Sequence, residues 1–419
     1  MEPQENSLED TPLQINGERL WQRLMTMATH GATPRGGCNR QALTDVDRRG
    51  RDLFVDWCRE AGYDTRVDAI GNIFARRAGM EALPPVLTGS HLDTQPTGGK
   101  FDGVYGVLAG LEVLNTLDEQ GIATRHPLEV AVWTNEEGCR FPSAMLGSAV
   151  WGGSMALADA LALEDREGHS VGDELVRIGY AGQEEASARP LKAAFELHIE
   201  QGPVLEAEQL DIGIVTGVQH MSRHLVTFSG EATHAGPTPM SMRRDPVRAL
   251  SALLPELYKL VEEHGVDTRV TVGFLDARPG AGNTVPHTVE LTVDVRHPLA
   301  AVYSDLRAAV TDLAAGAATG AGVTAEVACL WEAPGVSFDE SCVASVRTAT
   351  QRLGLRARGI VSGAGHDACN LAGVAPTGMI FIPCEGGVSH NEAEAITPAQ
   401  ATAGANVLLH AMLEQAERP

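Results

Sequence analysis

Short apolar runs alternate with helical patterns along this chain, and this alternation is the feature that most constrains its fold. Residues 85–89 form a buried strand pattern, residues 104–114 carry apolar side chains at helical spacing, and residues 128–133 form the next strand pattern. Strands that alternate with helices pair in parallel and are covered by those helices. The sequence therefore predicts an α/β protein with a mostly parallel sheet, preceded by helices at 17–29 and 45–61.

The pattern changes near Thr216. A strand pattern is followed by a helix that starts at Asp245 and Pro246, because Asp caps a helix and Pro fits its first position. The further strand, strand, helix and strand patterns complete the order β-α-β-β-α-β, which is typical of a ferredoxin-like α+β unit. These patterns lie at 225–230, 245–264, 269–274, 288–295, 302–315 and 323–330. We expect an inserted domain at 216–331, within a discontinuous catalytic domain formed by 1–215 and 332–419.

The charge of the chain excludes several kinds of partner. Its 419 residues carry a formal net charge of −23, which repels nucleic acid and anionic membrane surfaces. No run of 18 apolar residues is present, so no membrane span is predicted. The polar N-terminus lacks the apolar core of a secretory signal, and the 7 cysteines show no Cys-x-x-Cys spacing. We expect a cytoplasmic protein with reduced thiols, a loose tail at residues 1–13 and a small-molecule substrate.

Four predicted strands each lead into a potential metal ligand. The first ends at His91, the second at the pair Glu136 and Glu137, the third at His198, and the fourth leads to His390. The carboxyl ends of parallel strands meet at one crevice, where ligands bind. A further carboxylate, Asp102, lies in a glycine-flanked turn before a helix, where the backbone can bend closely around an ion.

Three histidines and two carboxylates suit a pair of divalent ions bridged by one carboxylate. Mixed imidazole and carboxylate ligands favour Zn, Mn, Co or Ni over Mg or Ca. Such a pair activates water, and a further acid is then needed to move the proton of that water. The adjacent Glu136 and Glu137 supply a ligand and this acid. Asp93, two residues after His91, is predicted to orient the imidazole.

Each of these residues also has a plainer explanation. His91 and His390 alone would be polar loop residues, Asp102 a turn or helix cap, and Glu136 with Glu137 a solvated acidic pair. Asp93 alone would be a turn residue. Their joint placement after successive strands is what favours the metal site.

The motifs resemble those of a known family, and together they span nearly the whole chain in order. They are Gly89-Ser-His91-Leu-Asp93-Thr-Gln-Pro-Thr-Gly-Gly-Lys-Phe-Asp102-Gly, Thr134-Asn-Glu136-Glu137-Gly-Cys-Arg-Phe-Pro, Glu196-Leu-His198-Ile-Glu-Gln201-Gly-Pro, Thr233-His234-Ala-Gly-Pro-Thr-Pro-Met and Ser389-His390-Asn-Glu-Ala-Glu. The chain is similar to the binuclear amidohydrolases of the aminoacylase and carboxypeptidase clan. The nearest branch holds N-carbamoyl-L-amino acid hydrolases, β-ureidopropionases and allantoate amidohydrolases.

The resemblance implies a role for each matching residue. His91 and His198 would each bind one or the other ion, with Asp102 bridging the pair. Glu137 and His390 would complete the two shells, and Glu136 matches the general base of the family. The resemblance further implies substrate contacts from His234, Asn283, Arg296, Gln201 and Gly365, and a homodimer formed through the inserted domain, which closes as a lid.

Three of these residues lie in the inserted domain and have ordinary explanations of their own. Arg296 alone would be a surface charge, and Asn283 and His234 would be turn residues. One segment departs from the family pattern, because a small residue is expected at His220 and an aromatic residue near His224. This departure bears on lid closure or on the shape of the substrate.

We expect hydrolysis of a carbamoyl amide, with water attacking the ureido carbonyl of an N-carbamoyl-L-amino acid or N-carbamoyl-β-alanine. The products are ammonia, carbon dioxide and an amino acid. Allantoate, another anionic ureido acid, is the nearest alternative substrate, and an aminoacylase or dipeptidase activity is a second alternative. A non-catalytic binding protein on this fold is expected to have lost Glu136 or a ligand, and all six positions are present here.

Overall fold

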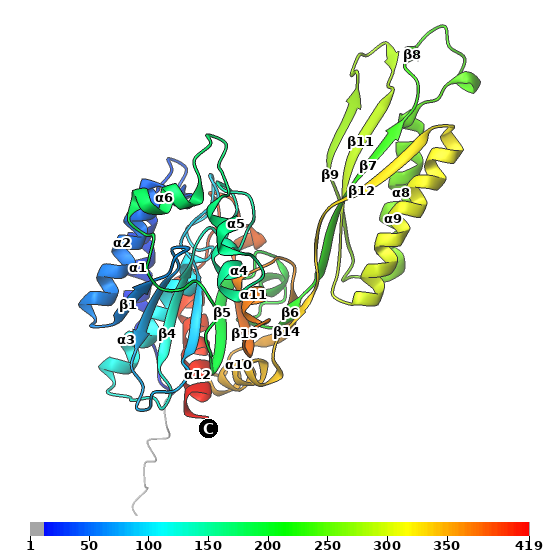
Figure 1. The fold of residues 1–419 in the computed structure, drawn as a ribbon. Coiled ribbons are helices and arrows are strands. Elements are labelled where there is room, and N and C mark those ends of the chain that lie inside the picture. Colours follow the sequence, from blue (N-terminus) through cyan, green and yellow to red (C-terminus); the bar gives the residue numbers. More distant parts are fainter. Residues whose placement is uncertain (1–11, 419) are drawn as a thin grey trace, which may run out of the picture. The chain divides into compact units, whose positions relative to one another are not determined.

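The computed structural model describes residues 12–418, in which the chain forms two compact units. One unit contains the chain up to Thr216 and resumes at Ser337, and the other is Gly217–Val336 (Figure 1). The expected N-terminal tail lies outside the described residues, apart from residues 12 and 13. No helix in the described part of the chain is both long and apolar enough to cross a membrane.

The first unit, here called the catalytic unit, contains a nine-stranded sheet in the order β1-β2-β4-β3-β5-β15-β6-β13, with β14 paired to β6. Strands β3, β4, β5 and β15 pair in parallel, whereas β1 with β2, β2 with β4, and β6 with β15 are antiparallel. The strands are β1 (Asp64–Val67), β2 (Ile73–Arg77), β3 (Val86–His91), β4 (Leu128–Trp133), β5 (Ala193–Ile199), β6 (Ile212–Val218), β13 (Val336–Ser337), β14 (Ala357–Ser362) and β15 (Thr377–Ile382). The predicted parallel sheet is therefore confirmed for its four central strands.

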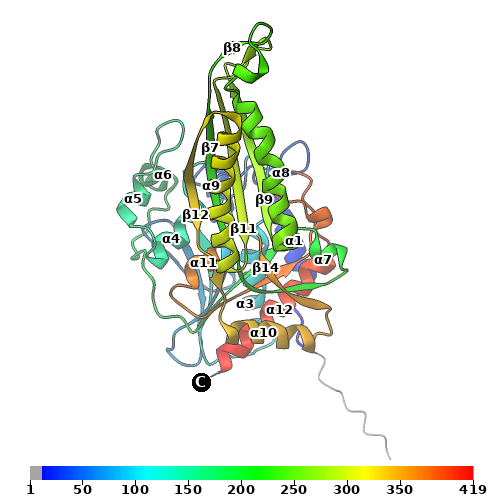
Figure 2. The same cartoon turned by 90° about the vertical axis from the view of Figure 1, so that its right-hand side faces the viewer.

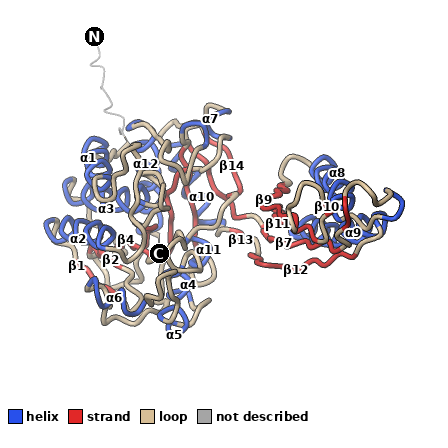
Figure 3. The backbone as a smooth tube through the Cα atoms, turned by 90° about the horizontal axis from the view of Figure 1, so that it is seen from above, coloured by secondary structure: helices blue, strands red, loops and turns tan. Residues whose placement is uncertain are grey.

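Helices cover both faces of these central strands, which explains why every residue of β3, β4 and β5 is buried (Figure 3). Helix α3 packs against β3, β4 and β5, and α12 packs beside it. The other face carries α4 and α11, whose Trp151 and Leu371 join one buried cluster with Trp133. The helices of this unit are α1 (Gly17–Ala28), α2 (Asp45–Glu60), α3 (Val104–Glu119), α4 (Leu146–Gly152), α5 (Leu157–Leu161), α6 (Val171–Ile178), α7 (Val204–Ala207), α10 (Glu340–Arg352), α11 (Asp367–Leu371), α12 (Pro398–Glu417) and the 3₁₀ turn η2 (Glu385–Gly387).

Two glycines let α3 lie unusually close to the sheet. A Cβ atom on Gly106 would lie 2.3 Å from the carbonyl oxygen of Leu197, and one on Gly110 would lie 2.7 Å from Thr88. Larger residues at these positions would push the helix outward. The start of α3, just after Asp102, is thereby held over the ends of β3 and β5.

The second unit, here called the lid unit, has a four-stranded antiparallel sheet in the order β12-β7-β11-β9. Two helices cover one face, and Figure 2 shows both in front of the sheet. The elements are β7 (His220–Ser229), β8 (Thr233–His234), η1 (Met240–Met242), α8 (Pro246–His264), β9 (Arg269–Arg278), β10 (Thr284–Val285), β11 (Thr288–His297), α9 (Ala300–Ala321) and β12 (Thr324–Ala333). The predicted β-α-β-β-α-β order is confirmed, with β8 and β10 as an added two-stranded pair.

Apart from α8, whose bounds agree with the prediction to one residue, the predicted elements of the lid unit are longer than the sequence patterns indicate. β7 begins at His220, although its first residues are largely polar, because pairing with β11 and β12 extends it. α9 continues through the Ala- and Gly-rich stretch beyond residue 315, where Ala318 and Ala321 are buried against the sheet. As predicted, the Asp245 side chain accepts a hydrogen bond from Val247 N at the start of α8.

The lid unit has its own apolar core, so a cavity there should destabilise it. Leu253 on α8 is fully buried in this core. We expect Leu253→Ala to lower the free energy of unfolding by about 2–5 kcal/mol. Tyr258→Ala, on the exposed side of the same helix, should change it by less than about 0.5 kcal/mol. Urea unfolding followed by circular dichroism measures both, and equal losses would contradict this assignment of the core.

Candidate metal centre and active site

Two histidines face one oxygen of Asp102 at the carboxyl edge of the sheet. Asp102 Oδ1 lies 3.1 Å from His198 Nε2 and 3.5 Å from His91 Nε2. His91 is the last residue of β3 and His198 lies near the end of the neighbouring parallel strand β5. All three side chains are buried. Together they form a group that could hold a metal ion.

The remaining ring nitrogens of these histidines are fixed by carbonyl groups. His91 Nδ1 lies 2.9 Å from the carbonyl oxygen of Asp93, and His198 Nδ1 lies 2.9 Å from that of Ile199. A carbonyl oxygen only accepts hydrogen bonds, so each Nδ1 carries the proton. Both Nε2 atoms then carry a lone pair and face Asp102, as is usual for metal-ligating histidines, and that of His198 accepts a hydrogen bond from Gly103 N at 3.1 Å.

The other oxygen of Asp102 faces a second group. His390 Nε2 lies 3.5 Å from Asp102 Oδ2 and 3.4 Å from Glu137 Oε2. These three residues also form a candidate metal group. The structure thus differs from the expected distribution of ligands, because His91 and His198 share one oxygen of Asp102. The reason is topological: β3 and β5 are adjacent, so their ends lie on the same side of that carboxylate.

Asp93 holds the turn that carries the two glutamates. Its carboxylate accepts hydrogen bonds from the backbone N–H groups of Glu136 and Glu137, both at 3.2 Å. The expected orientation of His91 comes from the backbone carbonyl of Asp93, since its carboxylate oxygen is 3.9 Å from the ring. Glu136 Oε2 lies 3.5 Å from His91 Nε2, beside the first candidate group.

The site contains more buried acid than its histidines can neutralise. Burial, followed by the charge of Asp102, raises the pKa of Glu137 to about 8. Burial likewise raises the pKa of Glu136 well above its ordinary value. A cluster of acids with raised pKa values is stabilised either by protons or by bound cations. The residues present therefore fit divalent metal ions. The acids with raised pKa values are Asp93, Glu136, Glu137, Glu196, Asp367 and Glu394, whereas, despite burial, His198 and His91 hold the pKa of Asp102 well below its ordinary value.

Glu394 is a site residue that the sequence reasoning missed. Its Oε1 atom accepts hydrogen bonds from the backbone N–H groups of Phe101 and Asp102, at 2.9 and 3.1 Å. A Cβ atom on Gly99 would lie 2.0 Å from the Glu394 carboxyl group, so only glycine fits there. Glu394 thus fixes the turn that presents Asp102. Its position four residues after His390, in the last motif, was the available signal.

A third group, also missed, lies behind His198. Glu196 accepts hydrogen bonds from Ser90 Oγ at 2.7 Å and Ala368 N at 2.8 Å, and the His366 ring packs 4.7 Å from that of His198. Glu196, His198 and His366 also lie close enough together to ligate an ion. These residues brace the His198 imidazole. A glutamate inside an apolar strand was the signal for Glu196.

Two residues predicted to bind substrate have different surroundings. Gln201 Nε2 donates a hydrogen bond to Asp102 Oδ2 at 2.8 Å, so it contacts the central carboxylate. Gly365 lies in the turn before α11, where an added Cβ atom would lie 3.2 Å from the Met145 side chain. The structure places Gln201 at the site and shows no direct contact of Gly365 with the ligand groups.

The three predicted substrate-binding residues of the lid unit lie at two separate locations in it. His234 pairs with Thr284 across β8 and β10, and Ala235 N donates a hydrogen bond to the Asn283 carbonyl oxygen at 2.9 Å. His234 and Asn283 are therefore neighbours, and both are exposed. Arg296 lies near the other end of β11, where its Nε donates a hydrogen bond to Asp294 Oδ1 at 2.7 Å.

The unusual histidines of β7 face away from Arg296. The His220 ring stacks on Tyr303 of α9 at 5.2 Å, and its Nδ1 accepts a hydrogen bond from Gly335 N at 2.9 Å. His224 lies four residues after His220 in β7, so both side chains point to the same face of the sheet. His224 Nε2 lies 2.9 Å from Ser222 Oγ. Both lie on the helix-covered face of the sheet, whereas Arg296 lies on the open face. The two histidines of this segment therefore lie among the contacts between the sheet and its helices.

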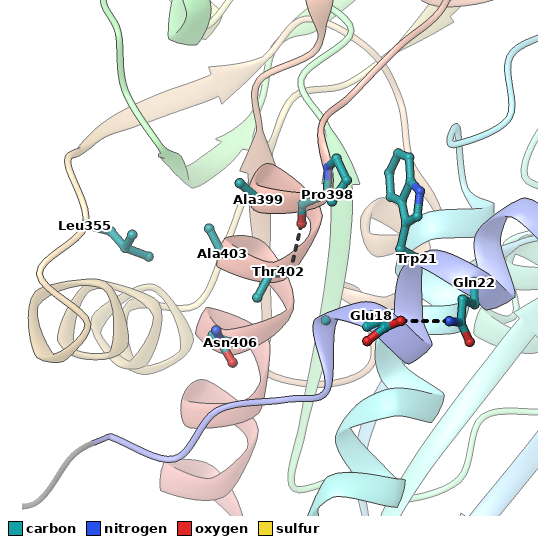
Figure 4. Close-up of a pocket in the computed structure, with 10 residues that line it drawn as sticks. Glu18, Trp21, Gln22, Leu355, Pro398, Ala399, Thr402, Ala403 and Asn406 are labelled. Carbon is teal, nitrogen blue, oxygen red and sulfur yellow. Dashed lines mark hydrogen bonds between the residues drawn. The ribbon is translucent and has the colours of Figure 1, made fainter.

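A surface hollow lies on the catalytic unit away from these ligands. It has a volume of about 690 Å³ and is lined by α1, the start of α12 and Leu355 (Figure 4). None of the candidate site residues lines it. Its Trp21 stacks on Phe101 at 5.6 Å, next to Asp102 in sequence, so the hollow borders the packing that supports the site.

Comparison with known proteins identifies the family. The model of Peptidase family M20/M25/M40 matches residues 87–414. An N-carbamoyl-L-amino-acid amidohydrolase from Rhizobium meliloti is 48% identical over 405 residues, covering 96% of this chain and 97% of that protein. An allantoate amidohydrolase from Bacillus subtilis (strain 168) is 34% identical over 385 residues, covering 91% and 93%.

The solved structures agree with this assignment. The crystal structure of an amidase of the hydantoinase/carbamoylase family from Burkholderia multivorans is 50% identical, with a TM-score of 0.95, and covers 97% of this chain and 99% of that one. The chain therefore belongs to the M20/M25/M40 peptidase family. The expected resemblance to amidohydrolases and the fold class are both confirmed.

The raised carboxyl pKa values predict how the metal-free protein responds to pH. In the folded state burial raises the pKa of Glu137 to about 8 and that of Glu394 to about 7, against 4.5 ordinarily. Between these values the folded protein holds protons that the unfolded chain has released, so stability falls as pH rises from about 5 to 8. Urea unfolding across this range, with chelator present, measures the slope.

Glu137→Gln is the matched control because it removes one such group, and its slope should be shallower. Added divalent metal should also flatten the slope of the wild type, since cations then replace the protons. Stability that rises steadily with pH in the presence of chelator would contradict these assignments.

Proposed function

We propose that this enzyme hydrolyses an N-carbamoyl-L-amino acid to the amino acid, carbon dioxide and ammonia, using two divalent ions per subunit. The single observation that carries the proposal is Asp102, whose two oxygens face separate ligand groups with Glu136 beside one of them. The name of the Rhizobium meliloti relative supports the substrate class. Imidazole with carboxylate ligands favours Zn, Mn, Co or Ni as the metals.

The residues divide the chemistry between them. His91, His198 and one oxygen of Asp102 would hold one ion, and Glu137, His390 and the other oxygen would hold the second. When bound, such ions polarise a carbonyl group and lower the pKa of water. Glu136 takes the proton of the attacking water and returns it to the leaving nitrogen. The overall change is R–NH–CO–NH₂ plus water giving R–NH₂, carbon dioxide and ammonia.

Arg296 is proposed to bind the substrate carboxylate. Asp294, which is largely buried, holds the guanidinium through Nε and Nη2, and Nη1 donates a hydrogen bond to Met221 Sδ at 3.3 Å, so the group is fixed on the open face of the lid sheet. A planar guanidinium recognises a carboxylate through two parallel hydrogen bonds. This local cation also offsets the net charge of −23, which would otherwise repel an anionic substrate.

The length of the lid unit indicates that two subunits serve one substrate. Arg296 pairs with Met221, and Thr288 pairs with Ser229, eight residues away along β11. This separation is about 26 Å in a strand. His234 lies beyond the Thr288 end, in β8 (Figure 1). An N-carbamoyl amino acid is far shorter, so Arg296 and His234 of one chain cannot both contact it.

We therefore propose a homodimer in which His234 and Asn283 reach the substrate of the partner subunit, where His234 stabilises the developing charge on the carbonyl oxygen. Edge strand β9 supports an interface through the lid unit, because Phe274 and Leu275 are about half exposed on it. We also propose a cytoplasmic setting, because all seven cysteines are unpaired in the structure.

Allantoate is the second candidate substrate, favoured by the Bacillus subtilis relative and by the same combination of ureido group and carboxylate. Ammonia release from metal-loaded enzyme should be measured with N-carbamoyl-α-amino acids, N-carbamoyl-β-alanine and allantoate. Amino acid release from N-acetyl amino acids and dipeptides tests the aminoacylase and dipeptidase alternatives. Fastest turnover of an N-carbamoyl-L-amino acid is expected, and no turnover of any compound would favour a non-catalytic binding protein.

Glu136→Gln should retain bound metal and lose about 10²–10⁴-fold or more in kcat, because it removes the proton carrier while leaving the candidate ligands intact. Metal content by elemental analysis and turnover should be measured on the same preparation. His91→Ala is the comparison variant, which should lose metal and activity together. Near-normal turnover by metal-loaded Glu136→Gln would remove Glu136 from the mechanism.

The crossed dimer predicts complementation between two inactive variants. His234→Ala and Glu136→Gln should each be inactive, because each removes one group that every site needs. In a mixed dimer, crossed contacts place both lesions at one site and leave the other site intact, so activity partly returns. Co-expression with two affinity tags isolates the mixed dimer for assay.

If the lid unit serves its own subunit, each site of the mixed dimer still carries one lesion. Purified mixed dimers without activity would therefore reject the contribution of His234 in trans. Mixed dimers of His234→Ala with Asn283→Ala provide the control, since both lesions then lie on lid residues and each site remains defective in either arrangement.

A further inference from the structure

The Glu137 carboxylate is held by one neighbouring residue, Gln95, which follows β3. Gln95 Nε2 donates a hydrogen bond to Glu137 Oε2 at 2.6 Å, and the Gln95 backbone N–H donates to Oε1 at 3.2 Å. Oε2 is also the atom that lies 3.4 Å from His390 Nε2. Gln95 therefore fixes both oxygens of the only carboxylate that belongs to the second candidate group alone.

The Gln95 side chain is itself oriented by Cys139. The Cys139 thiol donates a hydrogen bond to Gln95 Oε1 at 2.8 Å, which directs the N–H₂ end of the amide toward Glu137. The Gln95 backbone is fixed as well, because its carbonyl oxygen accepts hydrogen bonds from Thr94 Oγ1 and Gly98 N. Gln95, Cys139 and Glu137 thus form a closed hydrogen-bonded arrangement at the edge of the sheet.

This arrangement serves the more exposed of the two candidate groups. The first group consists of three buried residues, two of them on strands, whereas the His390 side chain is 50% exposed. Glu137, whose side chain is 4% exposed, is then the well-covered ligand that the second group does not share with the first. A carboxylate oxygen has two lone pairs, so Oε2 can accept the Gln95 hydrogen bond and still ligate a cation.

We propose that Gln95, oriented by the Cys139 thiol, is a positioning residue that sets the affinity of the second cation by fixing the Glu137 carboxylate. The inference rests on the two-ion site proposed above. Residues that hydrogen-bond metal ligands contribute about 10- to 100-fold to metal affinity. Gln95 is thereby assigned to the second ion, with no part in binding the first.

The test is calorimetric titration of metal-free full-length protein with Co²⁺ or Mn²⁺. Gln95→Met keeps the side-chain volume and removes the amide, and it should weaken the second ion by about 10- to 100-fold without changing the first. Cys139→Ala should weaken the second ion less, because it frees the amide to rotate. Gln22→Met is the matched control, since Gln22 donates a similar hydrogen bond to Glu18 on the surface.

A variant that lacks His390 distinguishes a positioning role of Gln95 from a general structural effect. His390→Ala removes a ligand of the second ion, and adding Gln95→Met to it should leave the affinity of the remaining ion unchanged. Weakening of both ions by Gln95→Met, or a lowered melting temperature of the metal-free protein, would overturn the assignment. Tighter binding of the second ion would also overturn it and would make Gln95 a competitor of the metal.

These outcomes also separate this inference from the proposed site. If the wild type binds two ions and Gln95→Met binds them equally well, the role of Gln95 is wrong and the site stands. If the wild type binds fewer than two ions, both the two-ion site and the role of Gln95 are overturned.

Discussion

The placement of one carboxylate, Asp102, determines the rest of the site. Its Oδ1 faces two histidines from parallel strands, and its Oδ2 faces His390 and accepts hydrogen bonds from Gln201 and Ser389. The turn that carries it is fixed by Glu394 through two backbone N–H groups. Because α3 lies close to the sheet through small residues, this turn stays directly over the strand ends. A shift of this turn would disturb both ligand groups together.

Buried negative charge is the second constraint. An isolated buried carboxylate is costly, and this site brings several together, so burial raises the pKa values of Glu136, Glu137 and Asp367. Bound cations would convert that repulsion into attraction. The same surplus that disfavours a metal-free site therefore favours metal binding, and Glu136, the proposed base, lies next to the candidate ligand His91.

The lid unit contributes through its length and its own core. Its sheet is packed against two helices, so β11 forms a stiff connection between Arg296 at one end and the region of His234 and Asn283 at the other. A stiff element of this length cannot bring both ends to one small molecule. The crossed dimer proposed above is the arrangement that would let both ends act on substrates.

The sequence by itself determined the order of the elements and predicted the candidate ligands, because strand alternation, helix caps and residue types at strand ends are local properties. His91, His198 and the helix start at Asp245 were identified in this way, and the added lid roles came from resemblance. Only the tertiary structure decided which oxygen of Asp102 each histidine faces, and which residues hold the ligands. Glu394 lies nearly 300 positions from its partner, and local patterns carry no information about such pairs, since side-chain packing brings them together.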